Sequence, residues 1–156
     1  MKNIETERKF LVNKEAWTHC LKPEGERYLQ GYLCIDETKS IRVRIAGERG
    51  VLTIKGAVRG ISRDEFEYPI PAGEATELLR LFAVGLVEKI RFKIPLGSFI
   101  WEVDVFYGSN EGLIVAEIEL GGEDDDFERP EWLGGEVTGD PRYQNSSLAL
   151  RPFLSW

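Results

Sequence analysis

Ile4 to Val12 reads I-E-T-E-R-K-F-L-V, and its pattern of charged residues at every second position indicates the fold. On a β-strand, side chains two residues apart share a face. One face of this segment therefore carries Glu5, Glu7 and Lys9. The other face carries Ile4, Thr6, Phe10 and Val12, with Arg8 as the exception. Such a row of charges backed by apolar residues suits hard-metal and phosphate chemistry if it faces an enclosed space.

The same alternation recurs along the chain. It is found at residues 41–45, 52–55, 65–68, 89–94, 101–105 and 116–120, and more weakly at 28–33. Strict alternation with β-branched and aromatic residues is typical of strands. Together with residues 4–12, these segments make eight candidate strands.

The charged faces of these segments are nearly pure in sign, acid with acid or base with base. Eight strands can close into a barrel that has no free edge. We therefore expect a mainly β fold: a closed eight-stranded antiparallel barrel with a charged interior, its apolar outside covered by a few short helices. The alternative is an ordinary solvated sheet face with cross-strand ion pairs.

Length and composition indicate one globular domain, residues 1–156. Charged residues make up 30% and hydrophobic residues 42% of the chain, an ordinary globular balance. The net charge of −7 argues against duplex nucleic acid as a partner, because duplex binding requires a basic face.

The cysteine pattern and the apolar runs bear on location. Cys20 and Cys34 lie outside any metal-type spacing, which fits free thiols in a reducing cytosol. No signal peptide or membrane-spanning run is found. We expect a cytoplasmic protein without a membrane partner.

Helices are expected to be few. Residues 74–83 have apolar side chains at helical spacing, and residues 14–20 follow Asn13 as a candidate N-cap. A third helix is predicted from residue 145 toward 154, beginning with an Asn-Ser-Ser capping cluster and limited by Pro152. The acidic run 123–126 is expected to be a solvated loop.

The charged rows supply two kinds of ligand. Carboxylates bind Mg²⁺ or Mn²⁺ together with water and substrate phosphates. The candidates are Glu5, Glu7, Glu65, Glu67, Glu102, Asp104, Glu117 and Glu119. Cationic side chains hold phosphate oxygens. The candidates are Lys9, Arg42, Arg44, Lys55, Lys89 and Arg91. Phosphate-loop, serine-elbow and Cys/His zinc signatures are missing, and the lone histidine, His19, falls in a predicted surface helix.

The chain resembles the triphosphate tunnel metalloenzymes, also called the CYTH superfamily, and especially their short bacterial tripolyphosphatase-like members. The family's N-terminal Glu-x-Glu-x-Lys pattern is matched by Glu5, Glu7 and Lys9. The resemblance continues through residues 30–33, 42–44, 52–56, 65–68, 89–91, 101–106, 116–120, 132–134 and 137–149. It implies an eight-stranded antiparallel barrel whose tunnel binds a triphosphate with a divalent metal.

The resemblance also implies roles for single residues. Glu5, Glu7 and Glu119 would bind the metal that organises the triphosphate. Glu117, Glu102 and Asp104 would serve a second metal or support the first. Phosphates would be contacted by Lys9, Arg42, Arg44, Lys55, Lys89 and Arg91. Of these, Lys9, Lys89 and Arg91 are the candidate catalytic residues, with Lys89 assisting water activation.

The resemblance also implies supporting positions, which are Glu65, Glu67, Tyr28, Tyr143 and Asn145. Tyr143, Asn145 and Ser147 would belong to a C-terminal plug helix closing one tunnel mouth, or else serve only in capping and packing.

Several functions are compatible with this resemblance. The first hypothesis is divalent-metal-dependent hydrolysis of a small triphosphate, above all inorganic tripolyphosphate. The alternatives are a class IV adenylyl cyclase, a thiamine triphosphatase and a non-catalytic module that binds polyphosphate or nucleotide. No purine-binding feature stands out, and Trp101 is expected to pack outward because it alternates with Glu102. The resemblance further allows a homodimer.

Overall fold

The computed structural model describes residues 3–156, and in this part of the chain it contains nine β-strands and three α-helices. The strands are β1 Ile4–Val12, β2 Glu26–Ile35, β3 Lys39–Ala46, β4 Arg49–Gly56, β5 Ser62–Pro71, β6 Leu86–Leu96, β7 Phe99–Tyr107, β8 Ile114–Glu119 and β9 Leu133–Glu136. The helices are α1 Lys14–His19, α2 Ala72–Phe82 and α3 Asn145–Leu150. Short 3-10 turns occupy Gly108–Asn110, Pro141–Tyr143 and Phe153–Ser155.

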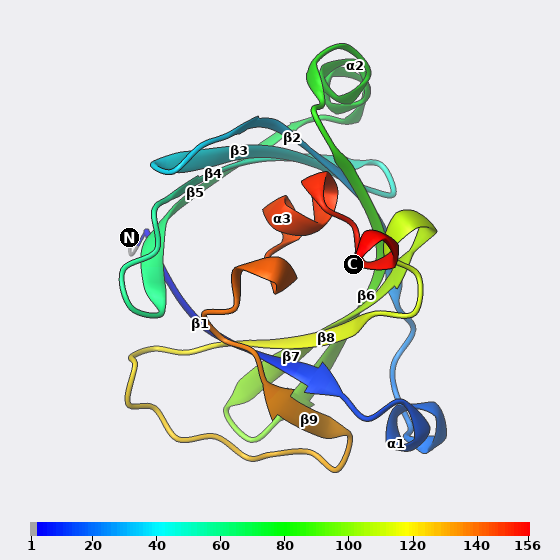
Figure 1. Ribbon diagram of the computed structural model, residues 1–156, viewed down its shortest axis with the longest axis vertical. Coiled ribbons are helices and arrows are strands. Elements are labelled where there is room, and N and C mark those ends of the chain that lie inside the picture. The colour runs from blue at the N-terminus through cyan, green and yellow to red at the C-terminus, as the bar shows by residue number, and fades with distance from the viewer. Residues whose placement is uncertain (1–2) are drawn as a thin grey trace.

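Eight of the strands form a closed antiparallel ring, which confirms the expected barrel (Figure 1). Their order is β5-β4-β3-β2-β6-β7-β8-β1, and the ring closes where Ile4, Glu5 and Thr6 of β1 pair with β5. All eight predicted segments coincide with these strands, except that β8 ends at Glu119, one residue before the end of the predicted segment 116–120. Because the ring is closed, one face of every strand must point into a common interior.

The ninth strand, β9, was not predicted. It pairs with the end of β1, with Glu136 opposite Phe10 and Leu133 opposite Val12. Its sequence, Leu-Gly-Gly-Glu, is short and shows no alternation. A Cβ at Gly134 would lie 2.8 Å from the carbonyl oxygen of Leu11, so glycine is what permits this close approach of the two backbones.

The outer face of β1, β7 and β8 carries the largest apolar cluster. Phe10 and Trp101 are fully buried and pack edge to face at 5.6 Å between ring centroids. Trp17 of α1 and Trp132, just before β9, cover them, with Trp132 lying 5.7 Å from Trp101. Trp101 thus packs outward, as expected. On the opposite side of the barrel, α2 packs Ala75 and Leu79 against β3.

The interior is charged, as expected, over part of its length. Beyond the charged rows, the inward positions become apolar: Val87 of β6, Phe106 of β7 and Val115 of β8. Leu148 of α3 is fully buried against them. The C-terminal segment runs inside the ring when the barrel is viewed end on (Figure 1). An apolar plug therefore fills one end of the barrel.

The helices agree with the predictions in position and differ in length. Asn13 caps α1, its side chain accepting a hydrogen bond from the backbone N–H of Ala16. In the third helix the α-helical turns stop at Leu150, before Pro152, which agrees with the limit expected from that proline. Cys20 and Cys34 are free thiols. None of the helices in residues 3–156 is long and apolar enough to cross a membrane.

Replacing Phe10 by alanine should lower the free energy of unfolding by about 3–5 kcal/mol, because a fully buried aromatic ring leaves a cavity in the outer cluster. Phe66→Ala is the matched control, since Phe66 also points outward from the barrel but is 41% exposed. Phe66→Ala should lower the free energy of unfolding by less than about 1 kcal/mol. Urea unfolding measures both values, and equal losses for the two variants would show that the outer cluster is not the stabilising core.

Candidate active site

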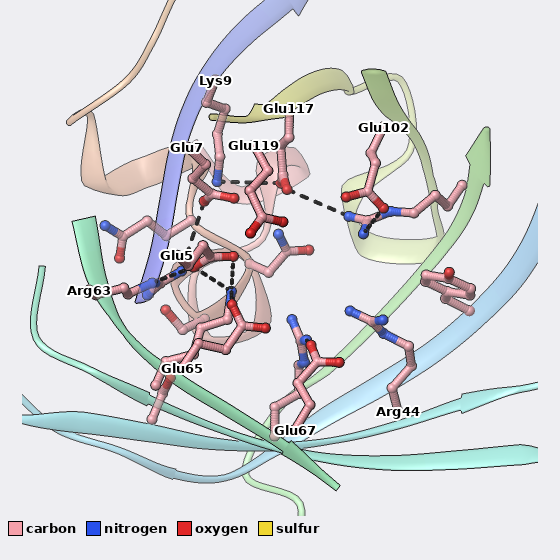
Figure 2. Close-up of a pocket in the computed structure, with 18 of the residues that line it drawn as sticks. Glu5, Glu7, Lys9, Arg44, Arg63, Glu65, Glu67, Glu102, Glu117 and Glu119 are labelled. Atoms are coloured by element: carbon pink, nitrogen blue, oxygen red, sulfur yellow. Dashed lines mark hydrogen bonds and ion pairs between the residues drawn. The ribbon is translucent and has the colours of Figure 1, made fainter. Parts of the chain in front are cut away.

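A cavity of about 280 Å³ occupies the charged part of the barrel interior (Figure 2). Seven carboxylates line it: Glu5, Glu7, Glu65, Glu67, Glu102, Glu117 and Glu119. Seven cationic side chains also line it: Lys9, Arg42, Arg44, Lys55, Arg63, Arg91 and Lys93. The lining therefore carries no formal net charge, although the whole chain carries −7. The surplus negative charge of the chain lies outside the cavity lining. The net charge of the lining therefore does not repel an anion.

Five of the carboxylates gather on one side of the cavity, with Lys9, Lys55 and Arg63 among them. The strand register places Glu7 opposite Glu119 and Glu117 opposite Glu102, so the neighbouring strands β1, β8 and β7 bring carboxylates together. We call Glu5, Glu7, Glu102, Glu117 and Glu119 the acidic wall. Arg42 and Arg44 of β3, with Arg91 of β6, form the basic wall. Figure 2 shows Arg44 across the open space from the Glu7 and Glu119 carboxylates. Since like charges repel, such a layout suits the binding of ions of both signs.

Glu5 is the best-neutralised carboxylate of the acidic wall. Its two oxygens accept hydrogen bonds from Lys55 Nζ at 2.8 and 3.0 Å, and Arg63 Nε donates to it at 2.9 Å. Burial alone would raise the pKa of Glu5, but the charges of Lys55 and Arg63 lower it to about 2. Glu5 is therefore an anion at neutral pH.

Glu117 is held in the same way by two cations. Lys9 Nζ and Arg91 Nη2 each lie 3.6 Å from one of its carboxylate oxygens. Although burial acts in the opposite direction, these charges keep the pKa of Glu117 well below its usual range. Arg91 also contacts Glu102 at 2.8 Å, so it links the basic wall to the acidic wall.

Glu7 and Glu119 lack such compensation. Within residues 3–156, Glu119 forms no ion pair, and the nearest cation to Glu7 is Arg63 at 3.9 Å. Burial, followed by the charges of Glu117 and Glu5, raises the pKa of Glu7 to about 7. Burial also raises the pKa of Glu119, and the negative charges of Glu5 and Glu102 raise it further. These two facing carboxylates are the part of the acidic wall that an added cation would stabilise most.

Glu65 and Glu67 on β5 behave as a carboxyl pair. Burial and a hydrogen bond to Glu67 raise the pKa of Glu65 to about 9, and the same bond lowers the pKa of Glu67. The pair therefore shares a proton at neutral pH. Arg42 lies 4.0 Å from Glu67 and Lys55 lies 3.8 Å from Glu65.

The basic wall contains an uncompensated cation. Arg44 stacks on the ring of Tyr28 with its guanidinium carbon 4.6 Å from the centroid, and its Nε is buried without a hydrogen-bond partner in the described chain. Arg91 lies 5.5 Å from the same ring. Burial and the charges of Arg42 and Arg91 lower the pKa of Arg44 to about 10. An anion in the cavity would supply the missing partner.

Lys89 and Asp104 lie behind the lining and not in it. The two side chains are fully buried, and Lys89 Nζ donates to Asp104 Oδ2 at 2.7 Å and to Asn145 Oδ1 at 2.9 Å. Arg91 Nε also donates to Asp104, at 2.7 Å. Burial is the main cause that lowers the pKa of Lys89 to about 7. The sequence did not decide the direction of this shift.

The plug reaches the cavity through Tyr143 and Asn145. The backbone carbonyl of Tyr143 accepts a hydrogen bond from Lys9 Nζ at 3.2 Å, and Asn145 lines the cavity. The capping alternative is wrong for Asn145: Gln144 occupies the N-cap position without a side-chain hydrogen bond, and the side chain of Asn145 faces Lys89. Ser147 lies outside the cavity, at a separate surface pocket.

Arg63 and Gln30 are site residues that the sequence reading missed. Arg63 precedes Glu65 and Glu67 on β5 by the same two-residue step, so extending the alternation by one position would have found it. Gln30 is fully buried and donates to Asn145 Oδ1 at 3.2 Å. Nothing in the local sequence signals that contact, because the partner is 115 residues away.

The carboxylates of the cavity bear on whether a divalent metal fits there. Among residues 3–156, no three carboxylate, histidine or cysteine side chains are arranged to hold a metal on their own. Mg²⁺ is nevertheless usually held by one or two carboxylates together with waters and substrate phosphates. Glu7 and Glu119, which have raised pKa values and little cationic compensation, fit a metal that binds together with a phosphate substrate.

Replacing Glu7 by glutamine should stabilise the metal-free protein at alkaline pH. The pKa of Glu7 is about 7 in the fold and 4.5 for the free side chain, so the folded state loses stability as pH rises between these values. Glu7→Gln removes this loss. Its free energy of unfolding in a chelator should match that of the wild type near pH 4 and exceed it by about 1–3 kcal/mol at pH 8.

Urea unfolding at both pH values checks this expectation. Glu77→Gln on the exposed side of α2 is the control, because Glu77 pairs only with Arg80 at the surface. A Glu7→Gln variant that is less stable than the wild type at pH 8 would show that Glu7 is already neutralised in the metal-free fold.

Comparison with known proteins gives a consistent result. The family model described as the CYTH domain matches residues 3–152. An inorganic triphosphatase of Acetivibrio thermocellus is 50% identical over 153 residues, which is 97% of each chain. An inorganic triphosphatase of Nitrosomonas europaea is 37% identical and covers 94% of this chain and 97% of its own length.

A solved structure supports the same relationship. The crystal structure of an inorganic triphosphatase superimposes with a TM-score of 0.65 at 34% identity, covering 94% of this chain and 97% of the other. The family match spans nearly the whole chain, and its relatives share the barrel and much of the sequence. The chain belongs to the CYTH domain family.

Proposed function

We propose that this protein hydrolyses inorganic tripolyphosphate with the help of a divalent metal ion. The observation that carries the proposal is an enclosed cavity lined by seven carboxylates and seven cationic side chains, with an acidic wall able to hold a cation and a basic wall able to hold an anion. The relatives described as inorganic triphosphatases support it, since the identity extends over nearly their whole length.

The basic wall would hold the phosphate chain. Arg42, Arg44 and Arg91 present guanidinium groups that can grip phosphate oxygens with two hydrogen bonds each. Lys9 and Lys55 would add point charges from the other side of the cavity. Transfer of a phosphoryl group to water depends mainly on positioning and on neutralising charge, which these side chains supply.

The acidic wall would hold Mg²⁺ or Mn²⁺. Glu5, Glu7 and Glu119 are the proposed ligands, with Glu102 and Glu117 in support and Asp104 behind them. The metal would neutralise phosphate charge and lower the pKa of a bound water. Lys55 and Arg63, which neutralise Glu5 in the metal-free protein, would then be free to turn toward phosphate oxygens.

The candidate catalytic lysines differ in their access to substrate. Lys9 and Arg91 both line the cavity, and Arg91 belongs to the basic wall. Lys89 is enclosed by Asp104 and Asn145, so direct contact with substrate would require its Nζ to leave one of them. We propose that Lys89 acts from behind the wall, adding positive potential to the site.

The cavity favours a phosphate chain over an organic triphosphate. Within the described residues its aromatic lining consists of Tyr28 and Tyr32, and Tyr28 is already stacked with two arginines. Trp132, whose ring could otherwise stack on a base, is buried in the outer cluster. Adenylyl cyclase and thiamine triphosphatase activities therefore rest on family resemblance alone. A pure binding module would have no need of the full acidic wall.

The test offers tripolyphosphate, ATP and thiamine triphosphate in parallel to purified protein with Mg²⁺ or Mn²⁺. We expect phosphate release mainly from tripolyphosphate and none in excess chelator. Cyclic AMP with pyrophosphate would instead indicate a cyclase, and preferential cleavage of thiamine triphosphate a thiamine triphosphatase. Binding without turnover would indicate a non-catalytic module and would contradict the proposal.

Two charge deletions should separate function from stability. Lys9→Ala and Arg44→Ala should each lower kcat/KM for tripolyphosphate by at least about 100-fold, since each removes a charged phosphate contact. Arg44→Ala should leave the melting temperature unchanged or higher, because a buried cation without an ionic partner is lost.

Arg8→Ala is the matched control for Lys9→Ala. Arg8 is the next residue on β1 but points outward, where it pairs with Glu136. Its kcat/KM should stay within about threefold of the wild type. Normal turnover in either Lys9→Ala or Arg44→Ala would show that the deleted side chain does not hold the substrate.

A further inference from the structure

Asn145 of the plug is oriented by two buried donors. Its Oδ1 accepts hydrogen bonds from Lys89 Nζ at 2.9 Å and from Gln30 Nε2 at 3.2 Å. Both donors come from the barrel wall, Lys89 from β6 and Gln30 from β2. With two nitrogen donors facing it, the oxygen of the Asn145 amide must point toward the wall.

The other half of the amide is left for the cavity. Asn145 Nδ2 makes no hydrogen bond to any other part of the described chain, residues 3–156. It is not enclosed either, because Asn145 lines the cavity, whereas Gln30 Oε1 is buried without a partner. Two N–H donors of a neutral amide are thus presented, in a fixed orientation, to the space between the walls.

The position of these donors places them with the basic wall. The strand register puts Gln30 opposite Arg44 and Lys89 opposite Tyr28, the residue on which Arg44 and Arg91 stack. Asn145 therefore stands among the side chains proposed to hold phosphate.

The lumen ends just beyond Asn145. Leu148, one turn further along α3, is buried against Val87, Phe106 and Val115. A phosphate chain cannot continue through this apolar packing, so a phosphoryl group that reaches Asn145 must be the end of its chain. An ester-linked group would have no room there.

We propose that Asn145 is a substrate-binding residue whose Nδ2 donates a hydrogen bond to an oxygen of a terminal, unesterified phosphoryl group. This inference rests on the proposed triphosphatase function and adds to it a neutral, directional contact from the plug. The plug then contributes to the binding site itself as well as filling the end of the barrel.

Asn145→Asp tests the contact with little change in shape. Aspartate keeps an acceptor for Lys89 and Gln30 but replaces the donors with an acceptor that repels phosphate. The KM for tripolyphosphate should rise on the order of 10- to 100-fold, with kcat within about threefold of the wild type. Circular dichroism and thermal melting confirm folding. If the variant does not fold, Asn145→Ala is judged by the same rise in KM.

Ser147→Asp is the matched control, because it adds the same charge two residues further along the plug but outside the cavity. Its KM should stay within about twofold of the wild type. An unchanged KM in an active Asn145→Asp variant, or a loss in kcat alone, would overturn this inference, the latter by showing that Asn145 acts only through Lys89. An equal KM rise in Ser147→Asp would also overturn it. A wild-type protein that leaves tripolyphosphate intact would overturn the proposed function as well.

Discussion

The structure depends on the closure of an alternating sheet around its own charged face. Once β1 pairs with β5, every second residue of eight strands must point inward, and in this chain fourteen of the inward residues that line the cavity are charged. Burying charges is costly unless they are paired. Lys55, Arg63, Lys9 and Arg91 supply that pairing for Glu5 and Glu117. Glu7, Glu119 and Arg44 lack such pairing. A bound cation could pair with the two carboxylates, and a bound anion could pair with Arg44.

Stability and function are divided between the two faces of the same strands. The outer face of β1 holds Phe10 in an aromatic cluster with Trp101, while the inner face of the same strand presents Glu5, Glu7 and Lys9. The apolar groups that favour folding thus lie on the outside, together with the plugged end of the lumen. The charged inner rows can then be optimised for binding at some cost in stability, a common trade-off in active sites.

Much of this arrangement could be predicted from the sequence, because a two-residue period is a local signal. The eight ring strands, the inward direction of Glu5, Glu7, Arg42 and Arg44, and the outward packing of Trp101 all follow from alternation. What the period does not encode is register between strands. The order of the strands places Glu7 opposite Glu119. It also places Lys89 where Asp104 and Asn145 separate it from the cavity.

The remaining misses have the same physical origin. β9 has two glycines and no alternation, and it exists because the end of β1 offers a free edge. The apolar end of the lumen is formed by inward residues that resemble ordinary core positions when each strand is read alone. The side chain of Asn145 resembled a helix cap because capping is a local rule, while its partners are 56 and 115 residues distant.

The most direct measurement of the central claim is a crystal structure with Mn²⁺ and a non-hydrolysable triphosphate analogue, with the metal located by its anomalous scattering. We predict that the phosphate chain lies inside the barrel along Arg42, Arg44 and Arg91, and that the metal peak lies between that chain and the carboxylates of Glu5, Glu7 and Glu119. A metal bound to the acidic loop at residues 123–126, or an analogue bound on the outer surface with the interior ion pairs intact, would contradict it.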